Sequence, residues 1–188
     1  YNGGVNIDPR VHKFMKPVVT AGGGAGGSAK VAVNYQLVDG KNYGGMPYGV
    51  LTPGILQSWV SYLPDSVIRE SAARQGGMLY NYAQIAFCYS EAAHRGWIPA
   101  SAGTKQQWYE IGINASMAQW GVSSADAATY VAGVGAATVE TIATEKWKAL
   151  YMMGEEAWAE HRRLDFPVLA RATDALTGTG IPVRLGYG

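Results

Sequence analysis

The sequence has little charge, one cysteine and no long apolar run. Cys88 is the only cysteine among 188 residues, so no disulfide can form within the chain. No stretch of about 18 consecutive apolar residues is present, which argues against a membrane-spanning helix. Fifteen basic and fourteen acidic side chains give a formal net charge of +1, and so small a net charge argues against binding to nucleic acid. We therefore predict a globular chain without a nucleic-acid partner.

Motifs for phosphate, metal or acyl chemistry are missing or incomplete. The letters GxGxxG occur from Gly22 to Gly27, but no helical period and no acidic residue follow as a dinucleotide site requires. Glu91 and His94 have the Glu-x-x-His spacing of di-metal helical bundles, but the second copy that such a site needs is absent. No Gly-x-Ser-x-Gly elbow occurs. We predict no catalytic residue, no metal site and no cofactor, and hence no enzyme.

The composition changes near Arg69. Before it, glycine, proline and tyrosine are frequent, and apolar residues keep no steady period. There we expect one short strand from Val31 to Val38, one short helix from Thr52 to Leu63, and irregular loop elsewhere. After it, helical spacing dominates. The sequence thus predicts a loop-rich, ligand-side segment over residues 1–69 and a helical region over residues 70–188, in one continuous domain that is incomplete at both ends.

Two adjacent helices are predicted in the second half. Between Met78 and Arg95, steps of three and four residues draw an apolar stripe, consisting of Leu79, Tyr82, Ala86, Tyr89 and Ala93. We expect this helix to be largely buried, with Cys88 as an inert thiol. Thr104 and Gln107 have the spacing of a capping box, which predicts a second helix ending at Gly121. The pair has the size of a tetratricopeptide-like unit.

A third, short helix is expected after Ser124, and a long one from Ala136 to Leu164. The long helix has a predicted buried stripe of Val139, Ala143, Trp147, Leu150, Gly154 and Trp158. Gly154 is expected to let another helix approach closely. Glutamates and two arginines share its last turns, and we expect arginine forks there to fix the helix to neighbouring segments.

Aromatic side chains in the first half form the predicted recognition surface, namely Tyr43, Tyr48, Trp59 and Tyr62. A flat aromatic ring can cover the apolar C–H face of a sugar, while nearby amide groups bond its hydroxyls. Asn42 and Gln57 are placed to supply such amides. The same rings also suit a role in covering a core, and both interpretations stay open.

Four sequence blocks, taken together, point to a family. They are NIDPRVHKF at Asn6 to Phe14, YGGMPYG at Tyr43 to Gly49, LYNYAQIAFCYSEAAHRGW, and WKALYMMGEEAWAEHRRLDFP with IPVRL. Their order and spacing resemble the C-terminal portion of the SusD/RagB family of nutrient-binding outer-membrane lipoproteins of Bacteroidetes, in particular its second SusD-like group. Residues such as His161 and Val183 depart from the usual pattern, where tryptophan and arginine are more common.

The resemblance implies an all-α, SusD-like helical fold with tetratricopeptide-like helix pairs and long irregular loops, of which this chain is a fragment. It implies a surface-exposed outer-membrane protein, lipid-anchored only through an upstream segment not in this chain. Such a protein captures oligosaccharide or peptide and delivers it to a SusC-like TonB-dependent transporter. A helical protein–protein interaction scaffold without small-ligand binding is the alternative function, and a glycan hydrolase is a third.

Overall fold

The structure is a computed structural model that describes residues 6–18, 36–45, 59–64, 67 and 78–170. The chain divides into two units. The first comprises Tyr1–Lys13 and Ala72–Val168, and the second comprises Phe14–Ser71 and Leu169–Gly188. Most of the described helical residues belong to the first unit, which is called the helical unit below.

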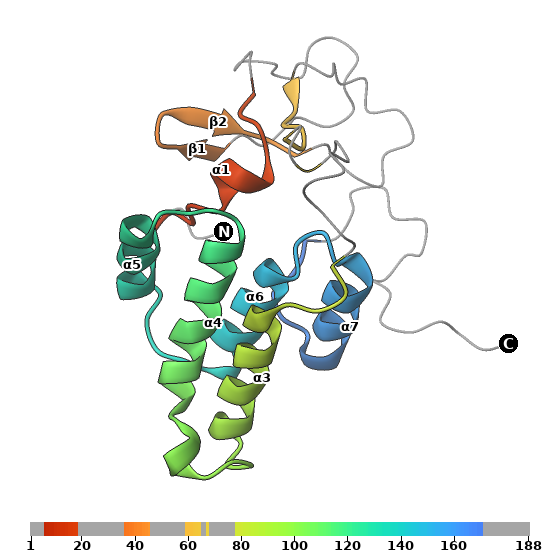
Figure 1. The fold of residues 1–188 in the computed structure, drawn as a ribbon. Helices are drawn as coiled ribbons and strands as arrows, with labels where there is room; N and C mark the ends of the chain where they lie inside the picture. The colour runs from red at the N-terminus through yellow and green to blue at the C-terminus, as the bar shows by residue number, and fades with distance from the viewer. Residues whose placement is uncertain (1–5, 19–35, 46–58, 65–66, 68–77, 171–188) are drawn as a thin grey trace, which may run out of the picture. The chain divides into compact units, whose positions relative to one another are not determined.

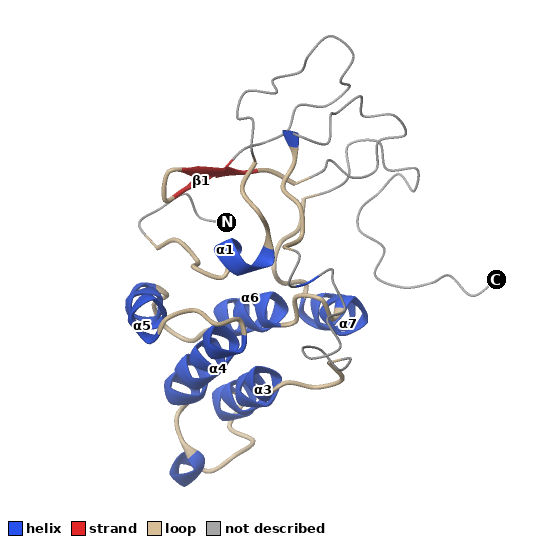
Figure 2. Cartoon of the chain, turned by 45° about the horizontal axis from the view of Figure 1, so that its top comes forward, coloured by secondary structure: helices blue, strands red, loops and turns tan. Residues whose placement is uncertain are grey.

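Five helices build the helical unit. They are α3 (Tyr82–His94), α4 (Lys105–Gln119), α5 (Ser124–Gly133), α6 (Val139–Ala149) and α7 (Gly154–Leu164). A short 3-10 turn, η2 (Ala100–Ala102), lies between α3 and α4, and the short helix α1 (Val11–Phe14) follows the N-terminal segment. α3 packs along α4, α4 also contacts α5 and α6, and α6 contacts α3 and α7 (Figures 1 and 2). The described part of the chain is therefore mostly helical, as expected.

Local sequence signals fix where these helices begin and end. Asn81, Thr104, Ser123 and Thr138 each precede a helix, and each accepts a backbone N–H three residues later with its side chain. The predicted capping box of Thr104 is confirmed, because the side chain of the residue three positions on bonds back to the Thr104 N–H. Among the described residues, no helix has both the length and the apolar character to cross a membrane.

The core lies between α3, α4, α5 and α6. Phe87 from α3 meets Tyr109 from α4 edge to face, with ring centroids 6.2 Å apart. A glycine makes this contact possible: a Cβ added at Gly112 would lie 2.8 Å from the Phe87 ring. Ile113 and Met117 continue the buried side of α4, and both are fully buried. The close approach between helices is therefore at Gly112.

The predicted buried stripe of α3 is wrong in most of its members. Leu79 is 88% exposed, Tyr82 58% and Tyr89 41%, and Cys88, expected to be buried, is exposed. The helix is apolar on two sides, so periodicity alone marked the wrong one. Long-range partners decide the buried side, which carries Ala83, Ala86, Phe87, Ser90 and Glu91. The Ser90 hydroxyl, for example, donates to the Lys105 carbonyl.

The single long helix expected from Ala136 to Leu164 is also wrong, because the chain breaks between α6 and α7. Met152 has a positive φ of 71°, which no helix interior permits. Leu150 and Met153 turn inward at the break and are buried. The Asn81 amide, 68 residues earlier, donates to the carbonyl of Ala149 at the end of α6. A distant side chain thus stabilises a helix end that the local pattern does not mark.

The predicted roles of Gly154 and Trp158 in a buried stripe are wrong as well. Gly154 is exposed, and a Cβ added there would have open space around it. Trp158 is 42% exposed, and the Arg162 guanidinium lies over its ring at 4.4 Å from the centroid. Both residues therefore belong to the solvent-facing side of α7.

In the second unit, strands β1 (Gln36–Val38) and β2 (Lys41–Tyr43) form an antiparallel hairpin in which Val38 pairs with Lys41. Asp39 and Gly40 connect them, and both have positive φ angles, 47° and 73°. An Asp-Gly pair with two positive φ angles is the favoured two-residue hairpin turn. Of the strand predicted from residue 31 to 38, the first five residues lie outside the described residues.

The helix predicted from Thr52 to Leu63 does not reach its predicted end. Trp59 lies in a 3-10 conformation, residues 60–63 are not helical, and residues 52–58 lie outside the described residues. The Ser61 N–H donates to the carbonyl of Gly44 at 2.7 Å, and the Ser61 hydroxyl accepts from the Gly44 N–H. Pairing with the end of the hairpin takes up the backbone groups that a helix would use within itself.

Candidate functional site

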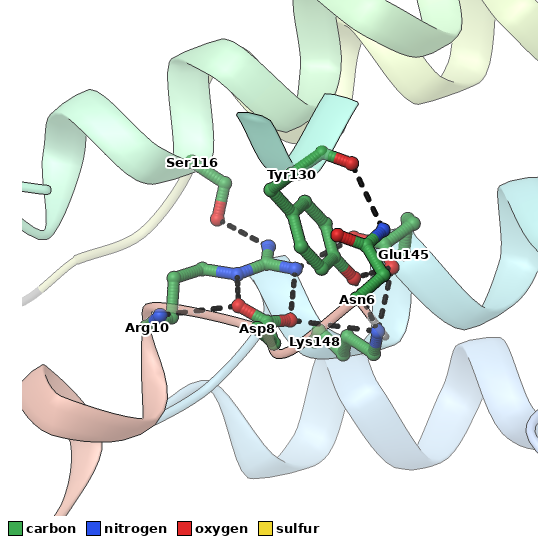
Figure 3. A network of polar contacts seen from close by, with 7 residues as sticks. All are labelled: Asn6, Asp8, Arg10, Ser116, Tyr130, Glu145 and Lys148. Carbon is green, nitrogen blue, oxygen red and sulfur yellow. Dashed lines mark hydrogen bonds and ion pairs between the residues drawn. The ribbon is translucent and has the colours of Figure 1, made fainter. Parts of the chain in front are cut away.

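A buried polar network joins the N-terminal segment to three helices of the helical unit (Figure 3). Arg10 is at its centre and has no exposed surface. Its Nε and Nη2 atoms donate to the Asp8 carboxylate at 2.9 and 2.6 Å, and Nη1 donates to the Ser116 hydroxyl of α4 at 2.9 Å. Nη2 also lies 2.6 Å from a carboxylate oxygen of Glu145 on α6. One guanidinium thus binds two carboxylates and a hydroxyl.

Two further residues of the network, Tyr130 and Lys148, bind the Glu145 carboxylate. The Tyr130 hydroxyl from α5 donates to its Oε1 at 2.7 Å, and Lys148 Nζ reaches the same oxygen at 2.6 Å. The Asn6 amide donates to the backbone carbonyl of Tyr130 at 2.9 Å. Lys148 also lies 3.4 Å from Asp8. Two cations therefore balance two carboxylates in a buried and fully bonded cluster (Figure 3).

Burial and charge in this network shift the pKa values of Asp8 and Tyr130. Burial alone would raise the pKa of Asp8, but the hydrogen bonds and charge of Arg10, with the charge of Lys148, hold that pKa below its ordinary value. Burial and the adjacent Glu145 carboxylate raise the pKa of the Tyr130 phenol. Both shifts move these two pKa values further from neutral pH. The cluster therefore acts as a clamp within the fold.

A second network fixes α7 to α3. Arg163 donates through Nη1 to Oε1 of Glu91 at 2.7 Å and through Nη2 to the other oxygen, a bidentate pair. Arg95 binds the same carboxylate at 2.8 Å. On α7, Glu160 accepts from Arg163 at 2.6 Å and from the buried Lys146 of α6 at 2.8 Å. The expected arginine fork is thus confirmed, and its partner is the Glu91 of the Glu-x-x-His motif.

These partners set the pKa of Glu91. The hydrogen bonds of Arg163, and then those of Arg95, lower it from 4.5 to about 2 although burial opposes the shift. The carboxylate pair in turn raises the pKa of Arg163. His94, the other member of the motif, is exposed on the last turn of α3. Within the described ranges, no group of three His, Cys, Asp or Glu side chains is arranged to hold a metal ion.

The four aromatic residues predicted to bind ligand all belong to the second unit. Tyr43 is buried, with 3% of its surface exposed, and burial raises the pKa of its phenol. Trp59 is half-buried and Tyr62 is 44% exposed. Tyr48 lies outside the described residues. The backbone pairing of residues 44 and 61 brings the Tyr43 and Tyr62 segments side by side. Their role in ligand binding stays a prediction.

Two open hollows occur on the helical unit, and sequence reasoning missed both. One, of about 360 Å³, lies along α4 and is lined by Trp108, Ile111 and polar neighbours. The other, of about 290 Å³, lies between α3, α6 and α7 and is lined by Cys88, Trp97 and Arg163 among others. The first had a visible signal, because residues 107, 110, 111 and 114 share one helical face. The second depends on contacts between distant segments.

Packed helices joined by two ion-pair networks define the helical unit as a helical scaffold. Residues 6–188 match the family model SusD-like_2, described as starch-binding and associating with the outer membrane. The chain therefore belongs to the SusD-like family. A comparison with curated proteins gave no match.

Solved structures show the same fold. A SusD homologue from Bacteroides vulgatus is 25% identical with a TM-score of 0.66, over 92% of this chain and 37% of the other. A homologue from Bacteroides thetaiotaomicron is 22% identical with a TM-score of 0.62, over 89% and 37%. A chitin-binding SusD homologue from Flavobacterium johnsoniae is 30% identical with a TM-score of 0.54, over 65% and 30%. The chain thus spans less than two fifths of the length of these relatives.

Proposed function

We propose that this chain is part of a nutrient-binding lipoprotein on the surface of the outer membrane. In this proposal the protein captures oligosaccharide or peptide and delivers it to a SusC-like, TonB-dependent transporter. The observation that carries the proposal is the family match over residues 6–188, because the family is described as starch-binding and associating with the outer membrane. The proposal includes attachment of the protein to the membrane through a lipid anchor.

The side-chain chemistry of the helical unit supports binding without conversion of the ligand. Asp8, Glu91, Glu145 and Glu160 are each held by cations at 2.5–2.9 Å. A general acid or base needs a group whose protonation changes near the working pH, whereas these ion pairs hold the pKa values of Asp8 and Glu91 below their ordinary values. The buried carboxylates therefore stabilise the fold that presents a ligand surface.

Within this proposal a glycan is the preferred ligand class. The family description names starch, and the relative from Flavobacterium johnsoniae is described as chitin-binding. Both are neutral polysaccharides, and a chain of net charge +1 carries no strong field that would select a charged polymer instead. A peptide ligand is the competing possibility.

Calorimetric titration of the full-length protein tests the proposal. Malto-oligosaccharides, chitin oligosaccharides and a pool of short peptides are titrated separately, and the products are then checked for cleavage. Saturable binding of one pool with no cleavage supports capture. Binding of no pool contradicts capture, and release of shorter products indicates a hydrolase.

A scaffold that binds only protein is a second candidate, and the outer face of α3 favours it. Tyr82, Ile85 and Tyr89 recur at helical spacing on this face and are between 36% and 58% exposed. A row of exposed apolar side chains on one helix face is typical of a protein interaction surface. Replacing Tyr82 and Ile85 by serine separates the candidates: a scaffold loses its protein partner, whereas ligand titration stays unchanged.

A further inference from the structure

The hollow beside α4 has the chemistry of a sugar-binding site. It measures about 360 Å³ and is open to solvent, a volume within the range of small-ligand sites. All of its described lining residues come from η2, the loop after it, and α4. A site on one rigid helix and its capped N-terminus keeps its geometry when the ligand arrives.

Trp108 supplies a fixed aromatic surface. Its Nε1 donates to the Ala102 carbonyl at 2.8 Å, so the indole has no remaining donor. Tyr89 stacks on it at 4.7 Å between centroids with an interplanar angle of 25°. Gly103 lies against the five-membered ring, where an added Cβ would be 2.7 Å from Nε1. Because contacts on several sides hold the ring, a ligand that packs on it costs little side-chain entropy.

Hydrogen-bond donors and hydrogen-bond acceptors both lie around the Trp108 indole. Gln107 uses its Oε1 to cap Thr104, which leaves its Nε2 donors without a hydrogen bond to any described residue. The Glu110 carboxylate accepts from Gln106 through Oε1 only, and Asn114 donates through Nδ2 to a backbone carbonyl, which leaves its Oδ1 open. One donor group and two acceptors therefore face the hollow from successive turns of α4. A sugar hydroxyl both donates and accepts, so it matches this set.

The charge of the lining narrows the ligand class. Of the described residues that line the hollow, Glu110 alone is charged. A carboxylate without a cation beside it disfavours uronate, sulfate or phosphate groups and the C-terminus of a peptide. An indole ring, an aliphatic Ile111 and two amides instead suit the C–H face and hydroxyls of an uncharged pyranose. We propose that this hollow binds neutral sugar units of an oligosaccharide.

This inference rests on the proposed capture of glycans and assigns part of that capture to the helical unit. The sequence-based prediction had placed all ligand contacts on the aromatic residues of the loop-rich segment.

The test is calorimetric titration of the full-length protein with chitin oligosaccharides and malto-oligosaccharides. The double variant Glu110→Ala/Asn114→Ala removes both acceptors while alanine preserves the helix. Loss of two hydrogen bonds is expected to weaken binding about tenfold. The matched control is Glu140→Ala/Gln119→Ala, which removes an exposed carboxylate and an exposed amide outside the hollow and leaves binding unchanged. Circular dichroism shows that each variant is folded.

A second variant blocks the hollow. Asn114 is exposed and lines the hollow, so Asn114→Arg is expected to be tolerated by the fold and to fill the hollow with a long charged side chain. This variant is expected to abolish the contribution of the hollow to oligosaccharide affinity. Wild-type affinity in both test variants overturns the inference and leaves glycan capture intact. A wild-type protein that binds neither oligosaccharide contradicts glycan capture itself, and the inference fails with it.

Discussion

At the residue scale, Arg10 carries a positive charge inside the helical unit, where its side chain has no exposed surface. A buried charge is tolerated only when partners replace its lost hydration, and Asp8, Ser116 and Glu145 do so at 2.6–2.9 Å. The DPR segment is thereby held to α4 and α6. The importance of this arginine follows from its contacts with Ser116 and Glu145, which are more than 100 residues away in the sequence.

Replacement of Arg10 by methionine is expected to lower the free energy of unfolding by about 3–5 kcal/mol, because it leaves two carboxylates without their main cation. Chemical denaturation of the full-length protein measures the loss. Arg162→Met is the control, since that guanidinium lies at the surface over the Trp158 ring, and its loss should cost less than about 1 kcal/mol. Equal stabilities of the two variants would contradict the clamp.

Glu91 gives the helical unit a predictable dependence on pH. Its pKa is about 2 in the folded chain against an ordinary value of 4.5. A lowered pKa stabilises the fold at pH values above the ordinary one, and this contribution disappears as the pH falls from about 4.5 to 2. Arg163 is partly exposed, so solvent screening reduces the contribution to roughly 1–3 kcal/mol.

The variant Glu91→Gln is expected to be less stable than the wild type at pH 7, and the difference should shrink steadily toward pH 2. Thermal unfolding at a series of pH values measures this convergence. Glu140→Gln serves as the comparison, because Glu140 lies exposed on the first turn of α6. A stability difference for Glu91→Gln that does not change with pH would show that the carboxylate charge is not what matters.

At the element scale, the contact of α3 with α4 depends on the absence of a side chain at Gly112. Gly112→Ala places a Cβ 2.8 Å from the Phe87 ring, and the resulting overpacking is expected to cost about 1–3 kcal/mol. Gly154→Ala is the matched control in another helix, where a Cβ meets open space and alanine should raise stability by up to about 1 kcal/mol. Thermal unfolding of both variants should therefore shift in opposite directions. Shifts of the same sign would contradict this packing.

The sequence predicts helix ends better than helix faces. Thr104 and Gln107 reveal a capping box, and Gly96 and Gly121 mark stops with positive φ angles of 71° and 66°, because caps are made by residues close together in the chain. The buried side of α3 was misjudged, since it is chosen by contacts with residues far along the sequence. The break before α7 was missed for the same reason, as Asn81 acts across 68 residues.

For the candidate site, too, the sequence predicts some features and not others. The fork that fixes α7 was expected because glutamate and arginine alternate near its end, although its partner Glu91 was not foreseen. The hollow lined by Trp108 was missed, because the contacts of the indole with Gly103 and Tyr89 that position it are seen only in the structure. When a helix such as α3 is apolar on two sides, only the structure shows which side is buried.

At the scale of the whole molecule, the chain belongs to the SusD-like family and spans 37% of the length of two of its structural relatives. Ion-pair networks fix the helices of the helical unit to one another. The described surface of this unit includes the hollow beside α4, the hollow between α3, α6 and α7, and the exposed apolar side chains of α3. In the proposed function, such surfaces provide separate places for a ligand and for a protein partner.

The most direct measurement is affinity purification of the full-length protein from detergent-solubilised outer membranes, with mass spectrometry of the proteins and small molecules that accompany it. Capture and delivery predict a large TonB-dependent barrel in near-equal amount together with bound oligosaccharide or peptide. Recovery of the protein without a barrel and without a ligand would contradict the account.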